Sequence, residues 1–101
     1  MRLVRVDDGA ENDWITGIAA REGWASLWTG AADTPSEGSW RWPDGAQFWM
    51  GDETGVAVGG LYERWATGEP DDTGDYGVLG VADREWSDSS GGTLPYVCEA
   101  Y

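Results

Sequence analysis

Carboxylates and turn-forming residues gather in one short stretch of the sequence, residues 65–76, which reads WATGEPDDTGDY. Glu69 and Asp71 flank Pro70, and further acids follow within a few residues. Ca²⁺ takes about six to eight oxygen ligands at roughly 2.4 Å, supplied by carboxylates, carbonyls and waters. X-Pro bonds are cis in about 5–6% of cases, and a cis bond before Pro70 could aim both flanking side chains at one point. The stretch is therefore predicted to be a calcium loop. Trp86-Ser87-Asp88, later in the chain, is predicted to contribute to the same site.

The elements that position this loop must be short. The chain has 101 residues, eight Trp and sixteen Gly. One domain spanning residues 1–101 is expected, with a modest core. Large rigid rings joined by a permissive backbone predict a loop-rich fold held by aromatic packing.

The hydrophobic pattern predicts strands over residues 3–6, 25–30, 40–42 and 96–101 and one helix after the first strand. Asp8 and Glu11 form a capping box at the helix start, and Gly23 is a plausible stop. Residues 50–60, with four Gly, indicate an excursion of low order. The expected apolar face of the helix consists of Trp14, Ile15, Ile18 and Ala19.

Charge and residue types exclude several functions. The net charge is −13 with six basic residues, so no basic patch is available for a phosphate backbone, and nucleic acid is not an expected partner. The chain has no His and one Cys, which disfavours transition-metal sites and rules out an internal disulfide. There is neither a signal peptide nor an apolar run near 18 residues, so no membrane partner is expected and the compartment is not written in these residues.

Five motifs resemble the C-type lectin-like domain in order and spacing. They are Trp28-Thr29-Gly30, residues 37–45 (EGSWRWPDG), Trp65-x-x-Gly68-Glu69-Pro70-Asp71, Trp86-Ser87-Asp88 and Tyr96-Val97-Cys98-Glu99. The longer spacer at residues 48–62 is similar to that of bacterial members. The resemblance covers about residues 2–101 and implies an α+β fold, with small antiparallel sheets, a flanking helix and a long calcium-binding loop region.

The resemblance also implies a ligand set. Glu69 and Asp71 match the two side chains beside the family's proline, and Asp88 matches the carboxylate of its Trp-Asn-Asp motif. Ser87 stands where the family usually has Asn, which exchanges an amide ligand for a hydroxyl. A further acid normally follows the proline, for which Asp75 is the best match and Asp72 a rival.

In the resembled family, vicinal hydroxyls of a sugar coordinate the calcium and hydrogen-bond to the same ligands. Charge-assisted bonds of this kind are about twice as strong as neutral ones. The resemblance therefore implies calcium-dependent carbohydrate binding, with Glu69, Asp71, Ser87 and Asp88 as the sugar contacts. Glu-Pro-Asp matches neither the mannose-type Glu-Pro-Asn nor the galactose-type Gln-Pro-Asp, so no sugar is named.

Other interpretations remain open. The acidic loop could be merely solvated, or could bind calcium without sugar, because a fold does not transmit function by itself. A calcium-independent protein-binding or structural module is the main alternative, with Trp49 and Tyr62 in its contact surface. A glycosidase is disfavoured, because acids gathered around one cation are ionised ligands rather than a pair with separated pKa values.

The ends of the chain depart from the family. The family's opening strand and first helix, whose Cys bridges to the position of Cys98, are expected to be missing, which suggests a fragment of a longer, extracellular or cell-surface protein. Cys98 is expected to be a buried thiol. Gly91 and either Tyr76 or Gly77 stand where the family has the two cysteines of a second disulfide. The missing strand would leave an unpaired edge that favours formation of an oligomer.

Trp28, Trp40 and Trp42 are expected to be core residues rather than sugar-stacking platforms.

Overall fold

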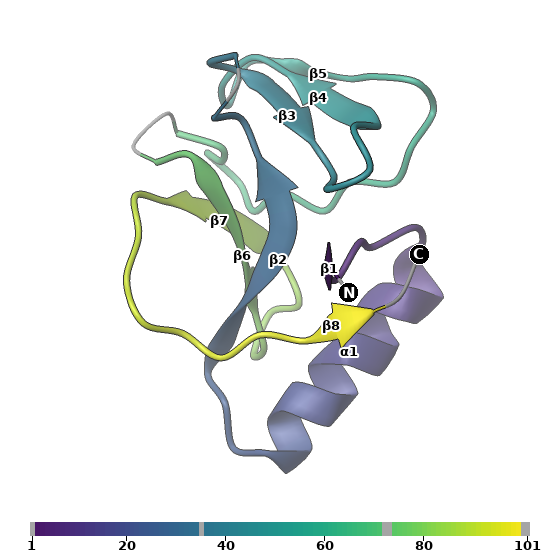
Figure 1. Cartoon of the computed structure of the whole chain (residues 1–101), viewed down its shortest axis with the longest axis vertical. Helices are drawn as coiled ribbons and strands as arrows, with labels where there is room; N and C mark the ends of the chain where they lie inside the picture. The colour runs from purple at the N-terminus through teal and green to yellow at the C-terminus, as the bar shows by residue number, and fades with distance from the viewer. Residues whose placement is uncertain (1, 35, 72–73, 100–101) are drawn as a thin grey trace.

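The computed structural model describes residues 2–34, 36–71 and 74–99, and its strands form two antiparallel sheets beside one helix (Figure 1). The larger sheet has the strand order β5-β4-β3-β2-β6-β7, and the smaller one pairs β1 with β8. This arrangement confirms the expected α+β fold. The elements are β1 (Arg2–Leu3), α1 (Gly9–Arg21), β2 (Ser26–Ala32), β3 (Ser39–Arg41), β4 (Gln47–Met50), β5 (Val56–Ala57), β6 (Tyr76–Gly80), β7 (Trp86–Ser89) and β8 (Cys98–Glu99).

The central strand β2 organises the larger sheet. Its side chains alternate between half-buried and buried, and the buried set is Leu27, Thr29 and Ala31. This period of two is the signature of a strand with one face in the core. Strand β6 pairs with it from Ser26↔Gly80 to Ala32↔Tyr76, with an irregularity in register between Trp28 and Ala32. The end of β2 therefore lies beside the start of β6.

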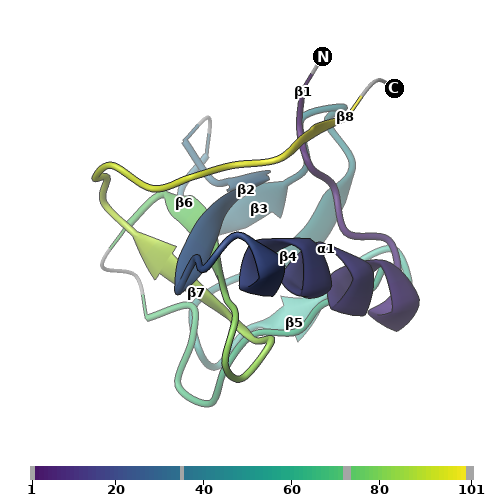
Figure 2. The same cartoon turned by 90° about the horizontal axis from the view of Figure 1, so that it is seen from below.

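The chain ends lie side by side, as Figure 2 shows for β1 and β8. Leu3 pairs with Cys98, the Val4 amide donates to the Val97 carbonyl at 2.9 Å, and Gly30 donates to Val4 at 2.9 Å. In this two-stranded sheet β8 has one neighbouring strand among the described residues, so the expected unpaired edge remains a prediction. The prediction of a buried Cys98 is wrong, because Val97 packs against the core and the strand alternation turns the next side chain to solvent.

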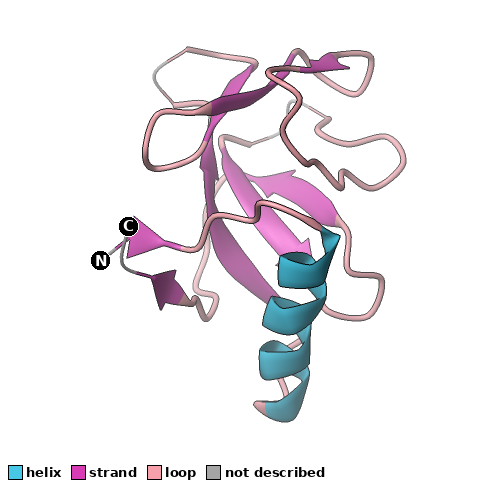
Figure 3. Ribbon diagram, turned by 90° about the vertical axis from the view of Figure 1, so that its right-hand side faces the viewer, coloured by secondary structure: helices cyan, strands magenta, loops and turns pink. Residues whose placement is uncertain are grey.

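Helix α1 begins as the sequence predicts. The Asp8 carboxylate accepts a hydrogen bond from the Glu11 amide at 2.7 Å, and the Glu11 carboxylate accepts one from the Asp7 amide at 2.7 Å. This is a capping box whose return bond reaches one residue further than usual. Figure 3 shows the helix beside the strands at one end of the molecule, with loops forming much of the other end.

The buried face of α1 differs from the expected one. It consists of Asn12, Ile15, Thr16 and Ala19, whereas Trp14 is 62% exposed and Ile18 is half-buried. The predicted and the observed buried faces both have helical spacing. The observed face is rotated about the helix axis, so that it includes Asn12 and Thr16 in place of Trp14 and Ile18. Those residues are satisfied, since the Thr16 hydroxyl donates to the Asn12 carbonyl at 3.0 Å and Asn12 bonds to Trp86.

Five aromatic rings form the centre of the core: Trp40, Trp42, Phe48, Trp65 and Trp86. Their contacts range from the stacked Trp42–Phe48 pair at 4.6 Å between ring centres to the Phe48–Trp65 pair at 6.1 Å, and most of them are edge-to-face. Such pairs add about 0.5–1.5 kcal/mol beyond the area they bury. The core prediction holds for Trp40 and Trp42. Trp28 is only half-buried and contacts Tyr76 instead.

Residues 50–60 are more regular than predicted. Strand β5 pairs with β4 through Met50↔Val56 and Trp49↔Ala57, and the Trp49 indole donates to the Asp52 carbonyl at 3.1 Å. The many glycines of this segment build a tight hairpin: a Cβ on Gly55 would lie 2.2 Å from the Met50 carbonyl oxygen. The expectation of low order is therefore wrong, because glycine permits close backbone contact as well as freedom.

Replacing Asn12 by Ala should strongly destabilise the domain. The Asn12 amide donates to the Arg84 carbonyl at 2.8 Å in a partly buried bond, and its oxygen accepts the Trp86 indole hydrogen at 3.0 Å inside the core. Losing both bonds leaves the Trp86 donor buried and unsatisfied, which should lower the free energy of unfolding by about 2–4 kcal/mol. Urea unfolding measures this change. The nearby Trp14→Ala, at an exposed position, should cost far less; an equal loss in both variants would contradict the assignment.

Candidate functional site

The loop that carries Glu69 lies along the free edge of β7. Trp65 forms a parallel bridge with Trp86, the Ala66 amide donates to the Trp86 carbonyl at 2.9 Å, and the Trp86 amide donates to Arg64 at 2.8 Å. Pro70 is fully buried, and the Glu69–Pro70 peptide bond is cis, as the sequence predicted. These contacts hold residues 64–71 beside the strand that bears Asp88.

Glu69, Asp71 and Asp88 form the first acidic cluster, called here the Glu69 cluster. One carboxylate oxygen of each lies within 4.8 Å of those of the other two. Asp88 is 8% exposed and accepts hydrogen bonds from the amides of Asp71 and Gly74, each at 3.2 Å. Its own amide donates to Glu69 at 3.2 Å. The backbone thus fixes the buried carboxylate, while Glu69 is half-buried and Asp71 is exposed.

Ser87 lies next to Asp88 on β7 and pairs with Val78. The strand buries Trp86 and Asp88 and leaves Ser87 and Ser89 half-buried. Successive side chains on a strand point to opposite faces, so Ser87 and Asp88 lie on different faces of β7. The role of Ser87 as a ligand remains a prediction.

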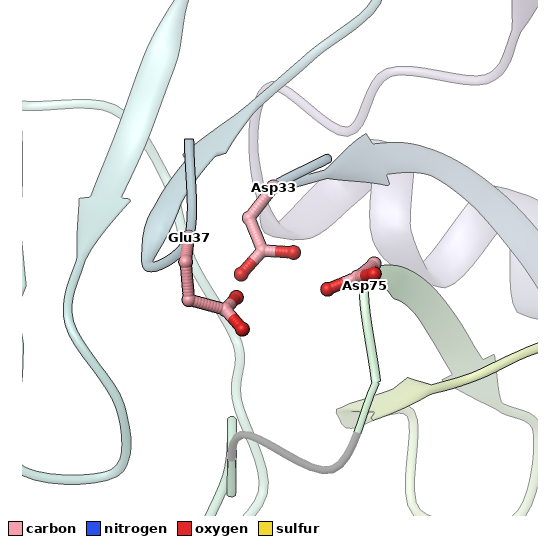
Figure 4. A group of neighbouring side chains, drawn as sticks. All are labelled: Asp33, Glu37 and Asp75. Carbon is pink, nitrogen blue, oxygen red and sulfur yellow. The ribbon is translucent and has the colours of Figure 1, made fainter. Parts of the chain in front are cut away.

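A second acidic cluster lies where β2 ends and β6 begins; it consists of Asp33, Glu37 and Asp75 and is called here the Asp33 cluster. Figure 4 shows the three carboxylates turned toward one another, and one oxygen of each lies within 4.8 Å of the others. The Asp33 amide donates to the Asp75 carbonyl at 3.0 Å. Asp33 is 2% exposed: its Oδ2 accepts from the Gly38 amide at 2.9 Å, and its Oδ1 has no hydrogen-bond partner.

The structure therefore divides the predicted ligands between two places. Asp75 was predicted beside Glu69, but it lies in the Asp33 cluster, because the Ala32↔Tyr76 register sets it against Asp33. Asp72, its rival, lies outside the described residues. Sequence reasoning missed Asp33 and Glu37. Two acids four residues apart in a Pro- and Gly-containing stretch, a few residues after a predicted strand, were the signal that could have revealed them.

Both clusters contain a carboxyl group with a strongly perturbed pKa. Burial, followed by the neighbouring Glu37 carboxylate, raises the pKa of Asp33 to about 7. Burial, followed by the Asp88 and Asp71 carboxylates, raises the pKa of Glu69 to about 7. Crowded, partly desolvated acids resist ionisation unless a positive charge joins them. The perturbed pKa values indicate that each cluster favours a proton or a cation.

The chemistry of the donor atoms fits a hard cation. Both clusters present carboxylate oxygens, the chain has no His, and its one Cys lies on β8. Three carboxylates per cluster leave several of the six to eight positions of Ca²⁺ to carbonyls and water. The partnerless Asp33 Oδ1 supports the same conclusion, because a buried charged oxygen without a hydrogen bond is costly unless an ion contacts it.

The described structure is a small α+β domain of the lectin type. It has paired ends, a central antiparallel sheet, a single described helix and acidic loops beside β2, β6 and β7. The chain matches the family model of the lectin C-type domain over residues 2–100, and it belongs to that family.

Similar proteins agree with this assignment. Halomucin of Haloquadratum walsbyi (strain DSM 16790 / HBSQ001) is 36% identical over 72 residues, which are 67% of this chain and 1% of that protein. The C-type lectin CEL-I of Cucumaria echinata has a TM-score of 0.69 and 27% identity, covering 93% of this chain and 63% of its own. The mouse scavenger receptor C-type lectin carbohydrate-recognition domain has a TM-score of 0.68 and 26% identity, covering 93% and 66%. The chain thus spans less than two thirds of CEL-I and a very small part of Halomucin.

In a calcium chelator, the stability of the domain should fall as the pH rises from about 4 to about 7. The pKa of Asp33 in the folded state, about 7, lies above the ordinary aspartate value of 3.8. Folding therefore favours protonated Asp33. Its contribution to the free energy of unfolding is complete at acid pH and is lost as the pH rises through about 7. Asp33→Asn keeps an acceptor for Gly38 without the charge, so at pH 8 it should be about 1–3 kcal/mol more stable than the native protein.

Urea titrations in EGTA between pH 5 and pH 8 test this expectation. Glu53→Gln serves as the control, because it removes one negative charge from an exposed position in the β4–β5 hairpin. If both substitutions stabilise the protein equally, net charge is the cause and the local explanation fails.

Proposed function

We propose that this domain binds glycans in a calcium-dependent manner through the loops that carry the two acidic clusters. The observation that carries the proposal is the buried Oδ1 of Asp33, which has no hydrogen-bond partner. This oxygen belongs to one of two adjoining carboxylate clusters, and the chain is a C-type lectin domain. Gly74 and Asp75 join them: the Gly74 amide donates to Asp88 and the Asp75 amide donates to the Ser89 carbonyl at 3.1 Å.

In this proposal the Glu69 cluster holds the ion that meets the sugar, and the Asp33 cluster holds a second ion that fixes the loops. A bound calcium supplies open coordination positions for sugar hydroxyls. The chain supplies the rest: Glu69 and Asp71 accept hydrogen bonds from those hydroxyls, and the backbone amides hold Asp88 in place. Carboxylates that bind an ion still have lone pairs for such charge-assisted bonds.

The relatives support a glycan partner and a binding function rather than catalysis. The mouse scavenger receptor domain is named for carbohydrate recognition. In this chain, the acids of the Glu69 cluster surround one point, as ligands of one cation would. An extracellular or cell-surface location is proposed from the family. Within the described part of the chain, no helix is long and apolar enough to cross a membrane.

The alternative, a calcium-independent protein-binding module, loses part of its predicted contact surface. Trp49 is 9% exposed and belongs to the core. Tyr62 is half-buried, with its ring 5.8 Å from that of Trp86, and stays partly accessible to a partner. Independence of calcium remains the result that would favour this alternative.

Calcium should raise the midpoint of thermal unfolding relative to EGTA. A ligand at about one hundred times its dissociation constant stabilises a protein by roughly 2.7 kcal/mol, which is a shift of several degrees for a domain of this size. Magnesium should raise it less, since it is smaller and gives up its water reluctantly. Differential scanning fluorimetry or calorimetry measures the midpoint, and a glycan array with and without EGTA then tests sugar binding.

Two Glu→Gln substitutions separate the site from general charge effects. Glu69→Gln should weaken calcium binding at least about tenfold, because it removes a charged ligand. Glu53→Gln, with the same chemistry on the exposed hairpin, should leave calcium affinity unchanged. If calcium stabilises neither the native protein nor Glu53→Gln, the acidic loops are not an ion site and the protein-binding module becomes the leading account.

A further inference from the structure

An open pocket lies between the central strand β2 and the segment that leads from β7 to β8. Figure 1 shows this segment crossing beside β6 and β2, and the Trp28 amide donates to the Pro95 carbonyl at 3.0 Å. The volume of the pocket is about 300 Å³, which is at the lower end of the range for small-molecule sites. The described residues that line it are Leu3, Trp28, Thr29, Tyr76, Gly91 and Gly92. None of these six belongs to either acidic cluster.

Two aromatic rings form a corner of this pocket. The ring centres of Trp28 and Tyr76 are 6.1 Å apart, and the angle between the ring planes is 79°. Tyr76 is 43% exposed and Trp28 is half-buried, so part of each residue remains accessible to a ligand. The faces of aromatic rings are electrostatically negative and attract a cation that lies within about 6 Å of the ring centre. The corner therefore suits a positively charged group.

The described walls of the pocket offer few free hydrogen-bonding groups. The Thr29 hydroxyl already donates to the Gly77 carbonyl at 3.1 Å and accepts from the Ala31 amide at 3.2 Å. The Gly91 amide donates to the Ser89 hydroxyl at 3.4 Å, and the Gly91 carbonyl accepts from that hydroxyl at 3.2 Å. A primary ammonium group or a sugar ring would give up hydrogen bonds to water in such a place, which costs binding free energy. A quaternary ammonium group has no N–H to satisfy.

The charge of the protein also favours a cation here. None of the described lining residues is charged, whereas the whole chain carries −13. Asp75, which directly precedes Tyr76, belongs to the Asp33 cluster. The potential of the protein therefore draws cations toward this region and repels anions. Within the corner, a cation meets ring faces rather than carboxylates.

We propose that the corner of Trp28 and Tyr76 binds a quaternary ammonium group, such as that of choline. Its methyl groups pack against the two rings, and its diffuse positive charge lies over their negative faces; aromatic recognition of this cation is a common use of such interactions. The site shares no described residue with the acidic clusters, requires no calcium and goes beyond the proposed glycan binding.

Three small molecules test the proposal: choline, its neutral isostere 3,3-dimethylbutan-1-ol and the primary amine ethanolamine. Each is titrated into the full chain, once in EGTA and once in calcium, and binding is followed in NMR spectra by the Trp28 indole signal and the amide signals of Gly91 and Gly92. Choline should bind about tenfold more tightly than either other molecule, because only choline combines positive charge with a methylated surface. Calcium should leave its affinity unchanged.

Each of the opposite results overturns the proposal. Equal binding of the neutral isostere would show that the pocket selects apolar shape alone. Equal binding of ethanolamine would show a general attraction of cations to an acidic protein. The same conclusion would follow if choline shifted the signals of Glu69, Asp75 and Asp88 and left that of Trp28 in place.

Substitutions of two tyrosines make the test specific. Tyr76→Leu keeps apolar bulk but removes the ring, so the preference for choline over its isostere should fall to within about threefold. Tyr76→Phe keeps the ring and should retain most of the preference. Tyr96→Leu makes the same change at a tyrosine that is 58% exposed and outside the described lining, and it should have no effect. Equal losses in Tyr76→Leu and Tyr96→Leu would refute the site.

Vesicles distinguish two sources of the group. If the protein sediments with phosphatidylcholine vesicles and free choline releases it, the natural ligand is a lipid headgroup; if it binds choline but not the vesicles, the ligand is a free small molecule. Either result supports the proposal. Failure of choline to bind in both EGTA and calcium overturns it and leaves calcium-dependent glycan binding to be judged by its own tests.

Discussion

The antiparallel pairing of β2 with β6 is the constraint on which the rest of this domain depends. It joins residues 26–32 to residues 76–80, and the side chains that follow or precede those strands inherit their positions from it. The two strands approach closely at Gly77, where a Cβ would lie 2.8 Å from both the Ala31 Cβ and the Thr29 hydroxyl. Thr29 uses that proximity to donate to the Gly77 carbonyl at 3.1 Å. A side chain larger than hydrogen at this position would separate the strands.

Close packing of the backbone also sets the loop next to this pairing. A Cβ on Gly74 would lie 2.0 Å from the Ser89 carbonyl carbon, so the chain entering β6 runs tightly against the end of β7. This contact places Gly74 where its amide reaches Asp88, and it directs Asp75 to Asp33. Two glycines without any chemistry of their own thus decide which acids meet.

Local sequence rules predicted those parts of the molecule that depend on neighbours in the chain. The Asp8 cap, the cis bond before Pro70 and the proximity of Glu69 to Asp71 are all properties of a few consecutive residues. The meeting of these two acids with Asp88 came from the family resemblance, which carries information on distant residues. Neither source placed Asp75 beside Asp33, because its position follows from the register of β6 against β2. The same limit explains Trp14 and Cys98: the periodicity of a helix or strand is visible in the sequence, but the phase that faces the core depends on what packs there.

The pairing of the two chain ends has a mechanical consequence. Arg2 lies opposite Glu99 in an antiparallel pair, so a force that pulls on both ends would open the β1–β8 bonds one after another, like a zip, rather than load them together. The first bonds to break would be those at the ends, and the Val4–Val97 bond would follow. The acidic clusters belong to the other sheet and its loops, beyond this seam. Under tension the domain could therefore lengthen at its ends before its acidic loops lose their shape.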